Sequence, residues 1–227
     1  MRSVGLVIAA TGLAAEARIA EHSKGVIAVA SGGDATRLAS LIEGLIADGV
    51  RGIISFGIAG GLRADLKSGT CVVGTSVVHG GRSYLADAAW TKRIAGCLPD
   101  AELGAIAGCQ SVVANPAAKK LLFDETGAIA ADMESHVAAR IAADRQVPFA
   151  VLRVIADPAH QRLPPAAIHG LKPDGSPDII AVIKSLRSEP SQLPDLIRAA
   201  IAARRAMIEL FRCHRLLGPG LGFTDLG

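Results

Sequence analysis

The sequence predicts an α/β protein: a three-layer αβα sandwich around a mixed central sheet. Short, continuously apolar runs of strand length recur along the chain, and continuous apolarity is typical of strands covered on both faces. Segments with one apolar face at helical spacing alternate with these runs, as expected for layered α/β folds. With 227 residues, of which 50% are hydrophobic and 20% charged, the chain is long enough to bury a large core.

Six runs are predicted to be strands. Four of them, residues 4–10, 25–30, 52–58 and 150–155, are apolar almost throughout. Residues 71–78 are rich in β-branched side chains, and residues 103–113 form a further predicted strand with fewer apolar side chains.

Five segments are predicted to be helices. Asp34 is a suitable N-cap for residues 35–48, whose apolar side chains fall on one face. Pro116 suits the first turn of a short helix that continues to residue 123. The remaining helices are predicted at residues 135–145, 179–186 and 192–214.

Residues 1–217 are predicted to form one domain, which includes a helical extension over 160–217, and residues 218–227 a loose tail. The net charge is only +3, with one Trp and one Tyr, so a nucleic-acid surface is not expected. Four cysteines without C-x-x-C spacing are interpreted as reduced core thiols of a cytoplasmic protein, and no metal site is predicted. No apolar run reaches the length of a membrane span.

Small and acidic residues gather at the predicted strand ends. They stand at residues 10–12, 31–33, 57–61, 132–134 and 157–158. Because ligands of open α/β sheets bind at the carboxyl ends of the strands, these residues are expected to share a site. The glycine-rich run 57–61 would let the backbone approach a ligand closely, or it is a tight turn without a ligand. It matches neither the Walker nor the Rossmann spacing.

Four charged residues near these ends are candidates for chemistry. Glu134 could accept both hydroxyls of a ribose with Met133 against the sugar, or it simply favours a helix start. Asp157 could be a partly desolvated proton donor, or an acid in a turn. Arg153 lies inside a predicted strand and therefore needs a carboxylate partner. Glu16 is a site acid or an exposed helix acid.

Three segments in order, GIISFGIAGGLRADLKSGTCVVG, ADMESHVAARIA and VLRVIADPA, resemble the purine nucleoside phosphorylase and methylthioadenosine/S-adenosylhomocysteine nucleosidase superfamily. The likeness spans about residues 4–158. The later part, with LPPAA, KPDGSPD and a long basic helix, resembles the hopanoid-associated phosphorylase branch. Members of that branch are thought to remove adenine from adenosylhopane.

The resemblance implies cleavage of the N-glycosidic bond of a purine nucleoside, with phosphate as co-substrate and no cofactor. It implies that Asp157 protonates the purine at N7 and that Glu134, with Met133, holds the ribose. Ala59 and Gly60 would contact base and sugar through the backbone, Arg153 would support the acids, and Glu16 lies near the base that activates water in nucleosidases.

Two departures from the family pattern leave the nucleophile open. Ser55 and Ile58 stand where hexameric phosphorylases carry an arginine and a serine, and Ala156 replaces the usual serine before the acid. Candidate phosphate contacts are Gly12, Gly33 and Arg18, with Arg37 and Arg82 as further cations. A nucleosidase that uses water and a non-catalytic nucleoside-binding module therefore remain as alternatives.

The resemblance also implies a homo-oligomer. The long C-terminal helix carries several arginines beside apolar residues, and two interpretations stay open. It is an ordinary amphipathic cover, or it contacts a membrane surface, which would make the protein peripheral to the inner membrane. The arginines are Arg198, Arg204, Arg205, Arg212 and Arg215.

Overall fold

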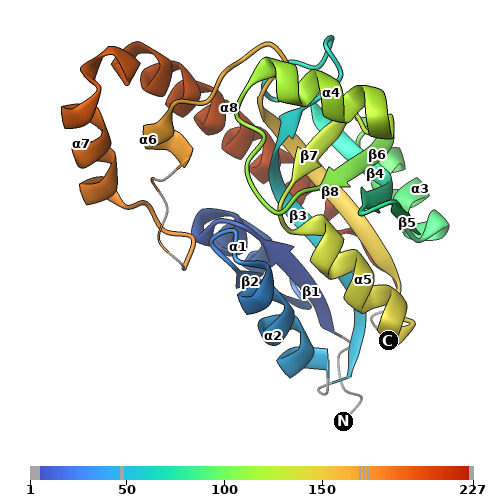
Figure 1. Cartoon of the computed structure of the whole chain (residues 1–227). Helices are drawn as coiled ribbons and strands as arrows, with labels where there is room; N and C mark the ends of the chain where they lie inside the picture. The colour runs from blue at the N-terminus through green and yellow to red at the C-terminus, as the bar shows by residue number, and fades with distance from the viewer. Residues whose placement is uncertain (1–5, 47–48, 169, 171, 173, 225–227) are drawn as a thin grey trace.

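The computed structural model describes residues 6–46, 49–168, 170, 172 and 174–224 (Figure 1). The strands are β1 (Leu6–Thr11), β2 (Val26–Ala30), β3 (Val50–Gly61), β4 (Cys71–His79), β5 (Arg82–Leu85), β6 (Glu102–Gly108), β7 (Ala130–Asp132) and β8 (Phe149–Asp157). The helices are α1 (Ala14–Glu21), α2 (Ala35–Ile46), α3 (Ala88–Cys97), α4 (Pro116–Thr126), α5 (Ser135–Arg145), α6 (Pro165–Ile168), α7 (Ile179–Ser188) and α8 (Leu193–Leu217). Two short 3-10 turns, η1 (Pro190–Gln192) and η2 (Pro219–Gly222), flank α8.

All the described strands belong to one mixed sheet, ordered β2-β1-β3-β7-β6-β4-β5, in which β8 pairs with both β3 and β4. Most neighbours are parallel, whereas β7 runs antiparallel to β3, and β4 antiparallel to β5 and β8. The pairings β3–β8, β8–β4, β4–β6, β6–β7 and β7–β3 close this half of the sheet into a ring. The predicted mixed α/β fold is confirmed.

Apolar clusters cover both faces of the sheet. One packs Ile42 of α2 against the sheet, together with α5, and the other packs Leu210 of α8 against the opposite face. Adjacent residues of β3 serve the two clusters in turn, with Ile53 in the first and Ile54 in the second. Burial of both faces is therefore why these strands are continuously apolar. Figure 1 shows α2 and α5 on the near side, with α8 behind.

Most predicted elements are present with shifted ends. The glycine run 57–61 is not a turn, because it continues β3 and pairs with β8 at Ile58 and with β7 at Gly60 and Gly61. The strand predicted over 103–113 ends at Gly108. Elements β5, α1, α3 and α6 have no predicted counterpart, since they are short or weakly amphipathic, and of β7 only the end at residue 132 is predicted. The predicted strand start at residue 4 and the helix end at residues 47–48 lie outside the described residues.

The loose tail predicted from residue 218 is wrong for residues 218–224. Leu221 is fully buried, and its carbonyl accepts a hydrogen bond from Trp90 Nε1 at 3.0 Å. The ring of Phe223 lies edge-on to Trp90 at 4.8 Å between centroids. A glycine-rich composition misled the prediction, because the glycines provide the turns that fold η2 back onto α3. Residues 225–227 lie outside the described part.

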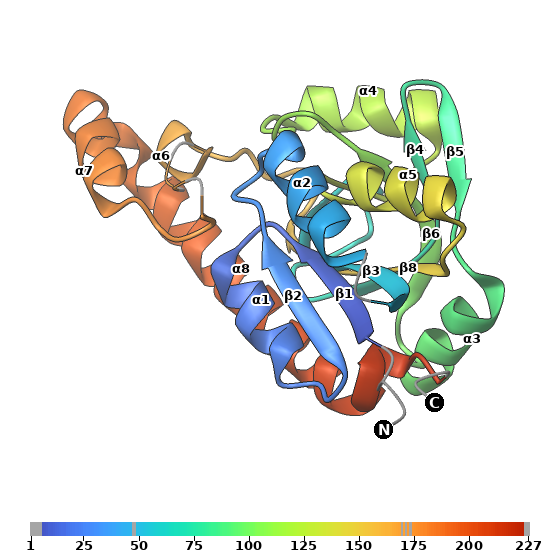
Figure 2. The same cartoon turned by 90° about the horizontal axis from the view of Figure 1, so that it is seen from below.

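Helices α6 and α7 and the first turns of α8 project from the body as an arm (Figure 2). Helix α7 has no buried residue, although its sequence is rich in isoleucine. In the described part of the chain, none of the helices combines the length and the apolarity that crossing a membrane requires.

We expect Leu221→Ala to lower the free energy of unfolding by about 2–5 kcal/mol, because it leaves a cavity against Trp90. Leu216→Ala is the matched control, since Leu216 is 47% exposed, and it should change stability little. Urea denaturation followed by Trp90 fluorescence measures both. Equal effects of the two substitutions would show that residues 218–224 are not anchored.

Candidate active site

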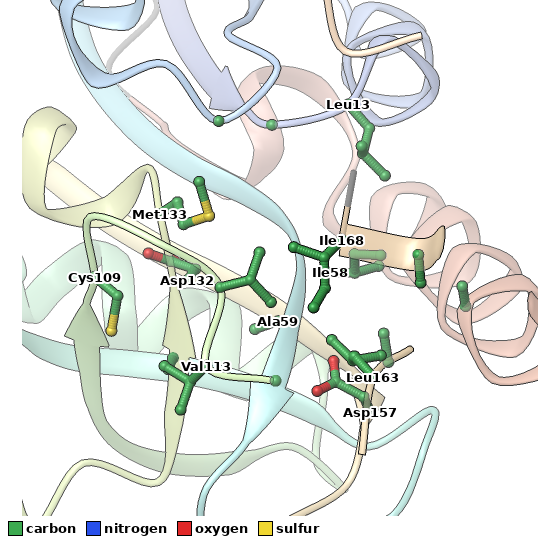
Figure 3. Close-up of a pocket in the computed structure, with 18 of the residues that line it drawn as sticks. Leu13, Ile58, Ala59, Cys109, Val113, Asp132, Met133, Asp157, Leu163 and Ile168 are labelled. Carbon is green, nitrogen blue, oxygen red and sulfur yellow. The ribbon is translucent and has the colours of Figure 1, made fainter. Parts of the chain in front are cut away.

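A cavity of about 420 Å³ opens at the carboxyl ends of the strands, between the body and the arm (Figure 3). Backbone segments from six strands or strand ends (β1, β2, β3, β6, β7 and β8) form its floor, and α6 and α8 form an apolar wall. Figure 3 shows Met133 and Asp157 on either side of Ile58 and Ala59 of β3. The predicted convergence of strand-end residues on one cavity is therefore seen.

Arg153, on β8, is fully buried below this cavity. Its Nε lies 2.6 Å from Asp132 Oδ2, and its Nη2 lies 3.4 Å from Glu134 Oε2. Nη2 also donates to Ser55 Oγ at 2.5 Å. Burial by itself lowers the pKa of Arg153, but the carboxylates of Asp132, Glu134 and Glu16 more than offset it, so the net pKa is raised. The carboxylate partner predicted for this arginine is present.

Glu16 is buried in the first turn of α1, so the alternative of an exposed helix acid is wrong. Its Oε2 accepts the backbone N–H of Gly12 at 2.9 Å and of Leu13 at 2.8 Å, and its Oε1 accepts that of Ile58 at 2.7 Å. Burial raises the pKa of Glu16, while Arg153 and these N–H groups oppose the rise. A Cβ at Gly57 would stand 2.6 Å from Glu16 Oε1, which explains the glycine there.

Asp132 holds the start of α5. Its Oδ1 accepts the backbone N–H of Ser135 at 2.9 Å, and its Oδ2 accepts the Ser135 hydroxyl. Sequence reasoning did not assign Asp132 this double role as partner of Arg153 and acceptor at the helix start. The only signal was its place at a strand end before a helix.

Glu134 is the N-cap residue of α5, where the helix dipole favours a carboxylate, but its side chain makes no capping hydrogen bond. Burial raises the pKa of Glu134 to about 7; the carboxylates of Asp132 and Glu16 add to the rise, and Arg153 opposes it. A Cβ at Gly12 would stand 2.7 Å from Glu134 Oε1, so Gly12 lets this side chain reach the cavity.

Met133 lies across the cavity floor from Asp157. A Cβ at Gly33 would come within 2.6 Å of Met133 Cε, and Gly33 has a φ of +86°, so both packing and backbone favour glycine at that position. Gly33 and Met133 therefore form a close pair at one side of the site, beside Gly12.

Asp157 is the last residue of β8, and its Oδ2 lies 2.5 Å from Nζ of Lys119 on α4. Lys119 is fully buried and also donates to the carbonyls of Asp157, Pro158 and Gln161. Burial raises the pKa of Asp157, and Lys119 opposes but does not cancel the rise. Sequence reasoning missed Lys119, because nothing in a short helix distinguishes a buried lysine from an exposed one.

The predicted site residues fall into two groups. Those at strand ends reach the cavity, with Arg153 directly beneath it. Arg18 does not reach the cavity, because it lies two residues after Glu16 on α1 and its side chain therefore points to the exposed face of the helix. Arg37 and Arg82 are also exposed and outside the cavity. The predicted site residues that line the cavity are Gly12, Glu16, Gly33, Ala59, Gly60, Met133, Glu134 and Asp157.

The family model described as the phosphorylase superfamily matches residues 9–201. Among curated proteins, none matches the chain. Futalosine hydrolase of Helicobacter pylori is 18% identical, with a TM-score of 0.62 over 87% of this chain and 99% of its own. The 5′-methylthioadenosine/S-adenosyl homocysteine nucleosidase of the same organism is 20% identical, with a TM-score of 0.62 over 86% of this chain and 99% of its own.

A third solved structure is S-adenosylhomocysteine nucleosidase from Streptococcus pyogenes in complex with 5-methylthiotubericidin. It is 17% identical, with a TM-score of 0.65 over 93% of this chain and 97% of its own. At this level of identity, the likeness of all three shows the fold.

The raised pKa of Glu134 makes stability depend on pH. Folding favours the protonated acid, so its contribution is full below pH about 4.5 and is lost as the pH rises through about 7. Relative to Glu134→Gln, the wild type should lose up to about 3 kcal/mol of unfolding free energy over this window. Urea denaturation at stepped pH measures the difference.

Glu125→Gln, on the exposed side of α4, is the control and should follow the wild-type profile. Parallel profiles for the wild type and Glu134→Gln would contradict the raised pKa of Glu134.

Proposed function

This chain belongs to the phosphorylase superfamily, and we propose that it cleaves the N-glycosidic bond of a purine nucleoside. The observation that supports the proposal best is that Glu134 and Asp157 line one cavity, with Met133 and the backbone of Ala59 and Gly60 beside them. An acid for the nucleobase and an acid for the sugar are the two groups that this reaction requires.

Glu134 is proposed to hold the ribose. In its ionised form the carboxylate accepts hydrogen bonds from both sugar hydroxyls, while the Met133 side chain packs against the sugar ring. Cleavage of the C–N bond develops positive charge on the ribose, as in other glycoside cleavages, and the nearby carboxylate stabilises that charge. Arg153 positions the carboxylate from below without contacting substrate.

Asp157 and Lys119 are proposed to assist the departing purine. In its protonated form, Asp157 is proposed to pass its carboxyl proton to a purine ring nitrogen as the C–N bond breaks, so that the negative charge on the purine is neutralised. The ammonium of Lys119, whose Nζ lies 2.5 Å from Asp157 Oδ2, then stabilises the carboxylate that remains. A carboxyl with a raised pKa suits the role of general acid.

We propose water rather than phosphate as the nucleophile. The N–H groups of Gly12, Leu13 and Ile58, which could have bound a phosphate, are taken by Glu16. Oε1 of Glu16 accepts only one of these bonds, which leaves it able to accept a proton from water. No arginine is among the described residues that line the cavity. Phosphate as co-substrate stays a prediction.

The substrate is proposed to carry a large apolar 5′-substituent, as adenosylhopane of the hopanoid-associated branch does. The support is the apolar wall that α6, α8 and the preceding loop add to the cavity. Its residues are Leu163, Ala167, Ile168, Leu196, Ala199, Ala200 and Ala203. An apolar group in contact with this wall gains binding free energy in proportion to the area that it buries.

Adenine release from adenosylhopane is the assay, with methylthioadenosine as the small substrate. Asp157→Asn should lower kcat by about 10²- to 10⁴-fold, because it removes the proton donor, whereas Asp124→Asn on the exposed face of α4 should not. Cleavage should proceed at the same rate in phosphate-free buffer and yield free ribose-containing product. No adenine from either substrate would contradict the proposed function.

Dependence of adenine release on phosphate would instead identify a phosphorylase and assign Glu16 another role. Faster cleavage of methylthioadenosine than of adenosylhopane would contradict the large 5′-substituent. Homo-oligomer formation is also proposed, and light scattering of the purified chain measures it.

We further propose that α8 contacts an anionic membrane surface. An exposed stripe on α8 combines four apolar side chains with Arg198, Arg204 and Arg205. The apolar members are Leu193, Ile197, Ile201 and Ile208, between 47% and 59% exposed. Such a stripe matches the apolar interior and negative headgroups of a bilayer, and Leu196 on the same helix lines the cavity.

The wild type should therefore co-sediment with phosphatidylglycerol-containing vesicles, and less with pure phosphatidylcholine. The double variant Ile197→Ser, Ile201→Ser should lose binding, because the stripe loses the apolar groups that enter the bilayer. Leu121→Ser, an exposed site on α4, is the control and should not change binding. Equal binding of the wild type and the double variant would contradict the contact.

A further inference from the structure

A second cluster of reactive side chains lies where α8 crosses the start of β4. Cys71 is the first residue of β4, while Glu209 and Cys213 are one turn apart on α8. The two sulfur atoms are 2.8 Å apart, and Cys71 Sγ is 3.4 Å from Glu209 Oε1. All three ligand atoms lie within 4.8 Å of one another. Cys71 and Cys213 are separated by 142 positions in the sequence, so no spacing motif predicts the cluster.

The cluster has both space and a charge partner. A cavity of about 280 Å³ is lined by Cys71, Glu209, Arg212 and Asp100, and none of its described lining residues belongs to the active-site cavity. Arg212 Nη2 lies 2.6 Å from Glu209 Oε1. Cys213 is fully buried behind Cys71, so the cavity reaches the cluster through Cys71 and Glu209.

We infer that Cys71, Glu209 and Cys213 bind a thiophilic divalent cation such as Zn²⁺. Two cysteine sulfurs and a carboxylate are donors that zinc accepts together. With both thiols ionised, their two negative charges and that of Glu209 balance the cation and Arg212, so the buried site is neutral. Each thiol releases its proton to solvent as the metal binds, and neither an oxidant nor a reductant is consumed.

The distances require a small adjustment. Tetrahedral zinc with Zn–S bonds of about 2.3 Å places its two sulfurs about 3.7 Å apart. The sulfurs must therefore separate by about 1 Å from the metal-free arrangement, and the cavity beside Cys71 provides the room. Three protein donors leave the fourth position to a water molecule, which this cavity can hold.

A bound cation would join the C-terminal half of α8 to the sheet. The N-terminal half of the same helix lines the active-site cavity with Leu196, Ala199, Ala200 and Ala203. The metal site would therefore anchor, at its far end, the helix that forms this wall of the cavity. A disulfide between Cys71 and Cys213 would make a similar joint, but it would leave Glu209 and the adjoining cavity without a role. The metal accounts for all of these features together.

The test is titration of the whole, reduced, metal-free chain with Co²⁺, whose bonds to thiolate give characteristic near-ultraviolet absorption. We expect about one thiolate-bound Co²⁺ per chain, displaced by Zn²⁺, and an unfolding temperature that rises with either metal. Cys71→Ser and Cys213→Ser should each weaken binding by about 100-fold or more, since even lost outer contacts cost roughly 10- to 100-fold.

Cys97→Ser and Cys109→Ser are matched controls and should bind as the wild type does, because neither sulfur belongs to the cluster. Glu209→Gln keeps both thiols and the size of the side chain, so it tests the third ligand even if a cysteine variant fails to fold. The Glu209→Gln variant should keep the thiolate absorption band but bind Co²⁺ with lower affinity. No thiolate band in the wild type, or an unchanged titration in the Cys71, Cys213 and Glu209 variants, would overturn the site.

Discussion

The buried charge of Arg153 is the constraint on which the rest of the site depends. A fully buried guanidinium is tolerated only where carboxylates and hydrogen-bond acceptors surround it, and here Asp132, Glu134 and Ser55 do so. Because β8 places Arg153 at the centre of the sheet, the acids must approach from neighbouring elements. One residue thus fixes the end of β7, the start of α5 and the floor of the cavity together.

This constraint also shapes the proton affinity of the acids around the cavity. Four carboxyls, those of Glu16, Asp132, Glu134 and Asp157, stand against two cations, Arg153 and Lys119. Burial then raises the pKa of Glu16, Glu134 and Asp157, that of Glu134 to about 7, so each of these acids keeps its proton to a higher pH than it would in water. Acids of this kind suit the roles that we propose for them, which are to give a proton to the leaving base and to stabilise a developing cation.

The fold and the main acids could be predicted from the sequence because they leave local signals. Continuous apolar runs reveal strands covered on both faces, and a charged residue inside such a run, as at Arg153, demands a partner. The partner itself is a matter of tertiary structure: Asp132 and Lys119 reach their roles through the pairing of β7 with β3 and the position of α4. The anchored tail and the Cys71–Cys213 approach escaped prediction for the same reason, since each joins segments far apart in sequence.

The charge of the cavity bears directly on the choice of nucleophile. A phosphate dianion entering the site would meet more carboxyls than cations, and Arg153 is already engaged by two of those carboxyls. Lys119 is tied to Asp157 and to three carbonyls, so it has no donor left for a phosphate oxygen. Neutral water meets no such repulsion, and a buried carboxyl with a raised pKa is well placed to take its proton. The same electrostatics that would stabilise a cationic sugar thus disfavour phosphate beside it, and this is the physical ground on which we propose hydrolysis.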